Sequence, residues 1–210
     1  MFKIFESIKN NINRANLKDS RFDFLFEKDE SGELVVLDTE TTGLDTKTDE
    51  ILSIAAVKIK DNKILTSQSF EIYLKSTKEL EAKNIEIHKI RPCDLKEAYE
   101  PYEAIVKLLE FIGSRTLVGY YLEFDIAMLN RYTRELLGIN LPNKTIEVSE
   151  LYFDKTIALI PQGNIDLSFD KILQNCNVPN MGVHNALNDA IMSAMIYLNL
   201  TLSKQKRVKI

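Results

Sequence analysis

The chain has 210 residues, of which 45% are hydrophobic and 28% charged, and its formal net charge is -4. These values are typical of a globular protein and exclude a disordered or fibrous chain, and the length suits one domain. The acidic balance argues against a protein that binds nucleic acid mainly through a broad basic surface. It does not exclude a nucleic acid substrate, because an enzyme that holds phosphate through bound cations adds its own carboxylates to the acidic total.

The sequence contains no signal for a membrane or for secretion. All apolar runs are shorter than the roughly 18 residues needed to span a bilayer, and Met1–Ser20 is too polar for a secretion signal. Cys93 and Cys176 lack CxxC spacing and are expected to be reduced thiols. We therefore expect a cytoplasmic protein without a membrane segment.

The first predicted elements are a helical lead-in and three strands. Ile4–Phe26 has a weakly helical pattern, and the charged turn Lys28–Gly32 separates it from the first strand. The polar pair Asp61-Asn62 separates the last two of these strands, and apolar and polar residues partly alternate in the strand before it. This pattern predicts a hairpin. The three strands are expected at Leu34–Leu37, Ile51–Lys60 and Lys63–Lys75.

The hydrophobic period becomes helical after Ser76. One apolar stripe predicts a helix that ends at Gly113, with these residues on its buried face: Tyr102, Ile105, Val106, Leu109 and Ile112. Thr116–Tyr120 is expected to be a fourth strand. Glu123–Leu137 then predicts a helix with Gly138 as its C-cap, and its inward residues are expected to be Ile126, Leu129 and Leu136.

The last third of the chain is predicted to be mainly helical. Thr145–Cys176 has a helical pattern that is interrupted around Pro161–Asn164. Asn185–Leu202 predicts a final helix that buries Leu187, Ile191, Ala194, Met195 and Leu198. Strands followed by alternating strand and helices predict an α/β fold, with one sheet covered by helices.

Asp38 and Glu40 are the first candidate site residues. They lie two positions apart at the end of an apolar strand, so both side chains point to the same side. Their mutual repulsion is costly unless a cation lies between them. The alternative is a polar turn after a short strand, and further acidic ligands elsewhere in the chain would decide for a metal site.

Three residues further along the chain could complete such a site. Asp125 follows the fourth strand, where active sites of open α/β sheets gather, although it could simply charge the first turn of its helix. His184 precedes the last helix and is expected to fold back toward Asp189. A zinc site at His184 is disfavoured, because the two cysteines are far apart in sequence and no second histidine is suitably spaced.

Three segments carry a family resemblance. LDTETTGL, GYYLEFD and HNALNDA resemble, in order and spacing, the three motifs of the DEDDh 3′-5′ exonucleases, a family that includes the proofreading epsilon subunit of bacterial replicative polymerase. The resemblance runs from Leu34 to Leu202. It implies a ribonuclease H-like fold, with a mixed five-stranded sheet whose first three strands are antiparallel and which is flanked by helices. We accordingly divide the chain into a helical extension (1–30), an exonuclease domain (31–203) and a short basic tail (204–210).

The resemblance also implies roles for the candidate residues. By motif position, Asp38, Glu40, Asp125 and Asp189 would bind two Mg²⁺ or Mn²⁺ ions. His184 would be the general base for hydrolysis of the terminal phosphodiester, which releases a nucleoside monophosphate. Four carboxylates would raise the pKa of His184 and keep it protonated, so we expect it to act only when metal and substrate are bound.

The segment after the first carboxylates is expected to hold the 3′-terminal nucleotide. In the family it does so with backbone amides and an apolar wedge, which here would be Leu44 in the run Thr41, Thr42, Gly43 and Leu44. Phe124 could stack on a base or belong to the core.

The chain departs from the family pattern at two places. Tyr120 and Tyr121 stand where many relatives have His-Asn, which puts the neighbouring substrate contacts in question. His88 lies in a segment that resembles a family Ile-His-Gly-Ile sequence, with Lys89 in place of Gly, and we assign it no catalytic role.

Three functions follow from this pattern. The leading hypothesis is a metal-dependent 3′-5′ exonuclease acting on the 3′ ends of single-stranded or frayed DNA, in repair or proofreading. The alternatives are the same site acting on RNA or short oligonucleotides, and an accessory subunit that mainly binds a polymerase or nucleic acid. Because few residues follow the last motif, we expect a freestanding nuclease rather than a polymerase subunit.

Overall fold

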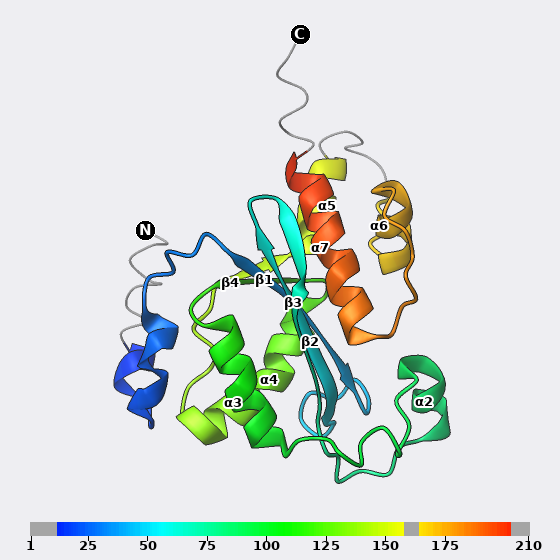
Figure 1. Cartoon of the computed structure of the whole chain (residues 1–210). Helices are drawn as coiled ribbons and strands as arrows, with labels where there is room; N and C mark the ends of the chain where they lie inside the picture. Colours follow the sequence, from blue (N-terminus) through cyan, green and yellow to red (C-terminus); the bar gives the residue numbers. More distant parts are fainter. Residues whose placement is uncertain (1–11, 158–163, 203–210) are drawn as a thin grey trace.

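The computed structural model describes residues 12–157 and 164–202, which form a five-stranded sheet flanked by helices (Figure 1). The strand order is β3-β2-β1-β4-β5. β1, β2 and β3 are antiparallel neighbours, whereas β4 and β5 add in parallel. The expected mixed sheet is therefore confirmed. Its strands are β1 (Leu34–Thr41), β2 (Ile51–Lys60), β3 (Lys63–Tyr73), β4 (Thr116–Gly119) and β5 (Thr145–Glu147).

Helices cover both faces of the sheet. η1, α3 and α4 pack on one face, in a core that includes Leu37 and Ile54. α5, α6 and α7 pack on the other face, against residues such as Val36 and Val57. The helices are η1 (Ser20–Phe26), α2 (Ala82–His88), α3 (Pro101–Ile112), α4 (Leu122–Leu137), α5 (Val148–Ile157), α6 (Phe169–Asn175) and α7 (Ala186–Leu202).

The central strand β1 is buried on both faces. Val35 and Leu37 belong to the core under α3 and α4, whereas Val36 belongs to the core under α7. This is the alternation that a strand with helices on both sides requires, and it explains why the segment is apolar without interruption. The same alternation decides where the acidic residues that end this strand will point.

The β2–β3 hairpin is formed as predicted. Asp61 and Asn62 make a two-residue turn with φ values of 51° and 61°, and Lys60 pairs with Lys63 across it. Two successive positive φ angles match the twist of the flanking strands, and Asp and Asn tolerate them better than most residues.

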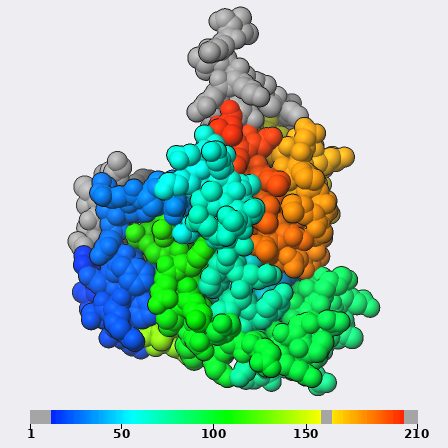
Figure 2. Space-filling model, in the orientation of Figure 1, coloured from blue at the N-terminus to red at the C-terminus, as the bar shows by residue number. Residues whose placement is uncertain are grey.

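The described part of the lead-in packs on the domain. Asp19 accepts a hydrogen bond from the backbone N–H of Arg21 at the start of η1, and Phe22 and Leu25 are buried in the core beneath α3 and α4. The Lys18 N–H donates to the carbonyl of Leu137 at 2.9 Å. In Figure 2 this blue segment lies against the green of the α3 region. The predicted helix before residue 12 and the basic tail lie outside the described residues.

The prediction for residues 145–176 was partly wrong. Thr145–Glu147 is strand β5, which pairs with Leu117–Gly119 of β4. The error has a physical cause, because three residues are too few for a period and pairing with β4 decides their conformation. α5 and α6 account for the helical remainder, and most of the predicted interruption lies outside the described residues.

In three helices the set of buried residues differs from the predicted one. In α3 Tyr102 is 43% exposed and Val106 only partly buried, whereas Ala104 and Leu108 are buried. In α4 Ile126 and Leu136 are partly buried, and in α7 so are Leu187, Met195 and Leu198. α7 crosses β1 and β2 at the centre of the sheet, so the small residues on its inner face are buried as well. No helix in the described ranges is long and apolar enough to cross a membrane.

Candidate active site

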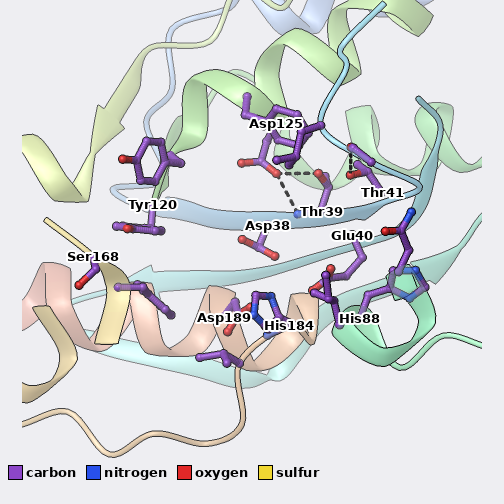
Figure 3. A pocket seen from close by; sticks show the side chains of 18 of the residues that line it. Asp38, Thr39, Glu40, Thr41, His88, Tyr120, Asp125, Ser168, His184 and Asp189 are labelled. Carbon is purple, nitrogen blue, oxygen red and sulfur yellow. Dashed lines mark hydrogen bonds between the residues drawn. The ribbon is translucent and has the colours of Figure 1, made fainter. Parts of the chain in front are cut away.

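The alternation along β1 separates the acidic residues at its end. Asp38 and Glu40 continue the series of Val36 and point toward α7, where Asp189 occupies the first turn. One carboxylate oxygen from each of these three residues lies within 4.8 Å of the other two. Figure 3 shows the three side chains together below β1. The structure thus brings together three of the four predicted carboxylates in one cluster.

Asp125 approaches from the other face of β1. Thr39 continues the series of Val35 and Leu37, and Asp125 Oδ1 accepts hydrogen bonds from the Thr39 N–H at 2.9 Å and its hydroxyl at 2.6 Å. Asp125 is only 4% exposed, and it lines the same pocket as Asp38 and Glu40 (Figure 3). The fourth carboxylate is therefore held at the strand end by Thr39.

A residue outside the motifs positions the start of α4. Glu147, at the end of β5, accepts hydrogen bonds from the backbone N–H groups of Tyr121 at 3.0 Å and Leu122 at 2.8 Å. Its Oε1 also accepts from the N–H and the hydroxyl of Ser149 at the start of α5. One carboxylate thereby satisfies the free amides at two helix N-termini, which orients the helix that carries Asp125.

Burial raises the pKa of all four carboxylates, and for Asp38 and Glu40 the charges of their neighbours add to this effect. Burial, followed by the charges of Asp125, Asp189 and Glu40, raises the pKa of Asp38 well above its usual value. Burial and the neighbouring aspartates raise the pKa of Glu40 to about 8. Burial also raises the pKa of Asp125 to about 7 and that of Asp189 to about 6, although both accept hydrogen bonds that act in the opposite direction. Only a counter-charge makes such a cluster stable in its ionised form.

The cluster fits a divalent cation. Asp189 Oδ2 accepts the backbone N–H of His184 at 2.8 Å, whereas its Oδ1 is buried and has no hydrogen-bond partner among the described residues. A buried acceptor without a partner is costly, and this one belongs to a carboxylate that clusters with those of Asp38 and Glu40. Three carboxylates that converge with a free oxygen are the ligand set that hard cations such as Mg²⁺ prefer.

His184 lies on the loop before α7, as expected, and is linked to Asp189. Its backbone has a φ of 62°, a left-handed conformation, and its N–H makes the hydrogen bond to Asp189 noted above. The residue is exposed and lines the pocket. The predicted fold-back toward Asp189 is therefore made by the backbone amide.

The loop after β1 presents Leu44 to solvent. Leu44 is 85% exposed, although it is apolar and close to the carboxylates. The Thr41 hydroxyl donates to the carbonyl of Gly43 at 2.7 Å. A Cβ atom at Gly43 would lie 2.5 Å from Asp49 Oδ2, so glycine is needed where the loop crosses Asp49.

Thr42 does not fit its predicted role as a substrate contact. Its side chain is buried, its hydroxyl donates to Asp49 Oδ1 at 2.9 Å, and its N–H donates to the carbonyl of Glu50 at 2.9 Å. Both donors are used within the loop. Thr41, Gly43 and Leu44 line the pocket instead, as does Phe124.

The pocket around these residues has a volume of about 960 Å³. Besides the predicted residues, α2 and α6 contribute side chains that the motifs did not identify. Short helices without a clear amphipathic pattern give no sequence signal for this role, and only Ile87 and His88 lay in a segment with a family counterpart. The additional lining residues are Lys83, Asn84, Ile87, His88, Ser168, Phe169, Asp170 and Val183, together with Tyr120 and Tyr121.

His88 is buried at the edge of this pocket. Its Nδ1 accepts the backbone N–H of Ile90 at 3.0 Å, and within residues 12–157 and 164–202 its buried Nε2 has no hydrogen-bond partner. Burial, with a further contribution from nearby His184, lowers the pKa of His88. The ring is therefore held neutral, with its proton on Nε2.

Comparison with known proteins places this site in a family. The family model described as Exonuclease (RNase_T) matches residues 35–197. The DNA polymerase III subunit epsilon of Rickettsia prowazekii is 31% identical over 183 residues, which cover 83% of this chain and 76% of that protein. The PolC-type DNA polymerase III of Thermotoga petrophila is 27% identical over 177 residues, but this chain spans only 12% of its length.

A solved structure agrees with the fold. Escherichia coli exonuclease I in complex with a dA16 oligonucleotide has a TM-score of 0.69 at 14% identity, over 84% of this chain and 42% of that one. The expected ribonuclease H-like architecture is confirmed by this likeness and by the sheet order. Together with the family match over most of its length, this shows that the chain belongs to the RNase_T family of exonucleases, of the DEDDh 3′-5′ type that the three motifs indicated.

Proposed function

We propose that the protein removes nucleotides from the 3′ ends of single-stranded or frayed DNA in a reaction that depends on divalent cations. The observation that carries this proposal is the convergence of Asp38, Glu40 and Asp189 within 4.8 Å, with one buried oxygen of Asp189 left unpartnered by the part of the chain that the structure describes. Burial and the charges of Asp189 and Asp125 raise the pKa of Glu40 to about 8, so a bound cation favours its ionised form near neutral pH.

The proposed ligands are Asp38, Glu40, Asp125 and Asp189, and the proposed ions are two Mg²⁺ or Mn²⁺. Bound there, these ions would stabilise the attacking and leaving oxygens of a phosphodiester. The protein supplies the rest. The Thr39 and His184 amides hold Asp125 and Asp189 in place, and Leu44 with the backbone of Thr41 and Gly43 would hold the terminal nucleotide.

His184 is the proposed general base. It would take a proton from the attacking water, and its exposed position at the pocket lets the ring turn toward substrate. A His184→Ala variant should lose most activity at saturating Mg²⁺ while it still binds the metal. Near-full activity of this variant would exclude the assignment.

DNA is favoured over RNA as the substrate. The relatives named above are subunits or parts of DNA polymerases, and exonuclease I was solved with a DNA oligonucleotide. The carboxylates themselves do not read the sugar, and only a contact to the 2′-OH would separate the two. Digestion of matched DNA and RNA oligomers should show faster release from DNA, and equal rates would favour the exoribonuclease alternative.

Association with a polymerase is the second candidate function. The Rickettsia relative is a polymerase subunit and covers most of this chain. Co-purification with a polymerase α-type subunit from native extract would support this role over that of a freestanding nuclease.

The central test is an Mg²⁺-dependent assay on single-stranded DNA. A 3′ label should be released at once as a nucleoside 5′-monophosphate, and a 5′-labelled copy should give products shortened by one nucleotide at a time. Asp38→Ala should abolish both signals. Asp154→Ala, which removes an exposed carboxylate of α5 outside the pocket, is the matched control and should leave both unchanged.

A further inference from the structure

An aromatic wall lines one end of the pocket, formed by Tyr120, Tyr121 and Phe169. The ring centroids of Tyr120 and Phe169 are 4.6 Å apart, and those of Tyr120 and Tyr121 are 4.8 Å apart in an edge-to-face arrangement. All three residues line the pocket that contains the carboxylates. Two separate segments, the start of α4 and the start of α6, meet here.

The wall and the Leu44 loop lie on different sides of the carboxylates. In Figure 3 Tyr120 and Ser168, which precedes Phe169, lie to one side of Asp38, and Glu40, Thr41 and His88 lie to the other. Any chain that crosses the carboxylates between these two regions therefore meets aromatic rings at one end.

The inner part of the wall is fixed. The Tyr120 hydroxyl donates to the carbonyl of Leu167 at 2.9 Å, so its ring is clamped between the end of β4 and the segment before α6. The ring packs against Phe169 in the core beneath α7. This part provides a rigid backing.

Tyr121 is held in an unfavourable conformation with its ring exposed. Its φ is 53°, which is costly for a bulky residue, and its N–H is fixed by Glu147. The residue is nevertheless 62% exposed, so burial does not compensate for the strain. Glycine or asparagine would adopt this conformation more readily. A strained backbone that presents an aromatic ring beside a cluster of acids indicates a ring selected for binding.

We propose that the aromatic wall stacks the base of the second nucleotide from the 3′ end. This inference rests on the proposed function. The scissile phosphodiester joins the terminal and second nucleotides, so a DNA strand that is extended across the carboxylates places one of these two nucleotides on each side of them. The Leu44 loop takes the terminal nucleotide, which leaves the second base to Tyr121. Every base has a π face, so this subsite accepts any sequence, but it requires that the second nucleotide be unpaired.

The test uses oligonucleotides that lack one base. A single abasic site at the second position from the 3′ end should raise the KM of the wild-type enzyme about 5- to 150-fold, the range expected for the loss of one base–aromatic stack. The same abasic site at the sixth position is the matched substrate. First-step rates on intact DNA establish the exonuclease activity separately, so a missing abasic effect with normal turnover would overturn the subsite alone.

Variants of Tyr121 assign the effect to its ring. Tyr121→Ala should raise KM on intact DNA and show no further loss on the abasic substrate, whereas Tyr121→Phe should keep the abasic penalty, because the ring stacks and the hydroxyl does not. Tyr99→Ala removes another exposed tyrosine, outside the pocket, and serves as the control. An undiminished abasic penalty in Tyr121→Ala would overturn the proposal.

A second readout separates binding from folding. Tyr121→Asn should raise KM as Tyr121→Ala does, while its thermal midpoint stays equal to or above that of the wild type, because asparagine relieves the strained φ. If Tyr121→Asn instead lowers the midpoint and leaves KM unchanged, the ring is structural, or serves a protein partner, and the proposal is wrong.

Discussion

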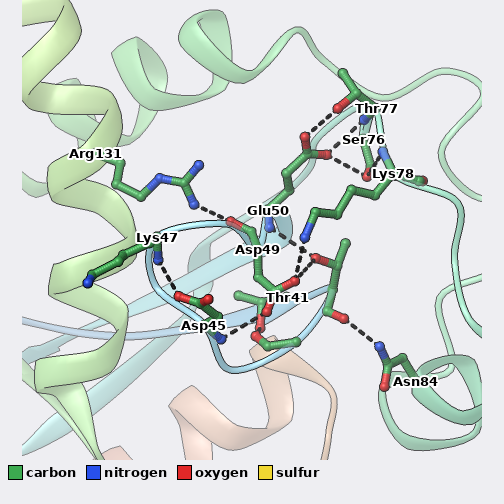
Figure 4. Close-up of polar contacts among 12 residues, drawn as sticks. Thr41, Asp45, Lys47, Asp49, Glu50, Ser76, Thr77, Lys78, Asn84 and Arg131 are labelled. Carbon is green, nitrogen blue, oxygen red and sulfur yellow. Dashed lines mark hydrogen bonds and ion pairs between the residues drawn. The ribbon is translucent and has the colours of Figure 1, made fainter.

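The loop at residues 42–50 and the loop at residues 180–185 both supply residues to the pocket, but they are anchored to different parts of the molecule. In the first, Asp49 accepts hydrogen bonds from the Thr42 hydroxyl and the Asp45 N–H and pairs with Lys78 at 2.7 Å. Arg131 of α4 donates to the Asp49 carbonyl, and Asn84 of α2 donates to the Thr42 carbonyl (Figure 4). Three elements beyond the loop thus fix the position of Leu44.

The second loop depends on the site itself. Asn188 of α7 donates to the carbonyls of Met181 and Gly182, and His184 is tied by its N–H to Asp189, one of the clustered carboxylates. The first loop is therefore held independently of the carboxylate cluster, whereas we expect the position of His184 to respond to the charge of Asp189 and to any cation bound there.

The largest effect is expected from Asp189. Asp189→Ala should lower kcat by about 10³-fold or more, because it removes a proposed ligand worth several kcal/mol in the transition state and also the anchor of His184. Asp189→Asn keeps an acceptor for the His184 N–H but loses the charge, so it should be almost as inactive. Nuclease rates over an Mg²⁺ titration measure this, and an active Asp189→Asn would show that the anchor, not the ligand, is what matters.

Metal removal should make stability depend on pH. In the metal-free protein the pKa values of Glu40, Asp125 and Asp189 are raised to about 8, 7 and 6, so the folded state binds more protons than the unfolded state. The contribution of these three carboxyl groups to the unfolding free energy is therefore fully present below about pH 4 and is lost as pH rises toward 8.

Thermal unfolding in the presence of EDTA at several pH values measures this dependence of stability on pH. The midpoint should drop by about 5 °C or more between pH 5 and pH 8, and Mg²⁺ should restore more of it at pH 8, where protons no longer compete for the carboxylates. Glu40→Gln should flatten the curve. A metal-free midpoint that rises over this range would contradict the predicted sign.

Loosening the first loop should weaken substrate binding without loss of metal binding. Asp49→Ala removes three interactions of a mostly buried carboxylate and should cost about 1 to 3 kcal/mol of unfolding free energy. Because it loosens Leu44 and not the metal cluster, KM should rise more than kcat falls. Asp45→Ala, which loses exposed hydrogen bonds with the Lys47 N–H and the Thr48 side chain, is the control and should cost at most about 0.5 kcal/mol. A collapse of kcat in Asp49→Ala would remove the distinction between the two loops.

The sequence predicted the acidic residues of the site better than the residues that line the rest of the pocket. The two-residue spacing of Asp38 and Glu40 was enough to place both on one side of β1, because alternate residues of a strand point to the same face. The same rule places Thr39, and with it Asp125, on the opposite face, which the motifs do not express.

The walls depend on tertiary contacts. His88 and Phe169 lie on seven-residue helices whose position is decided by packing rather than by period. Strand β5 was missed for the same reason, since its three residues form a strand only because β4 pairs with them. Short elements have little pattern of their own, and they carry the pocket lining that the sequence did not reveal.

The smallest effect is expected at Leu44. Because this side chain is 85% exposed on a loop that other residues hold, Leu44→Ala should change the unfolding free energy by at most about 0.5 kcal/mol. It should still raise the KM for single-stranded DNA several-fold, since the proposed apolar contact with the terminal base is lost. Leu44→Met keeps that contact and should restore the KM. If Leu44→Ala instead lowers kcat at unchanged KM, the side chain positions the reacting groups. The first loop would then be coupled to the reacting groups, as the second loop is.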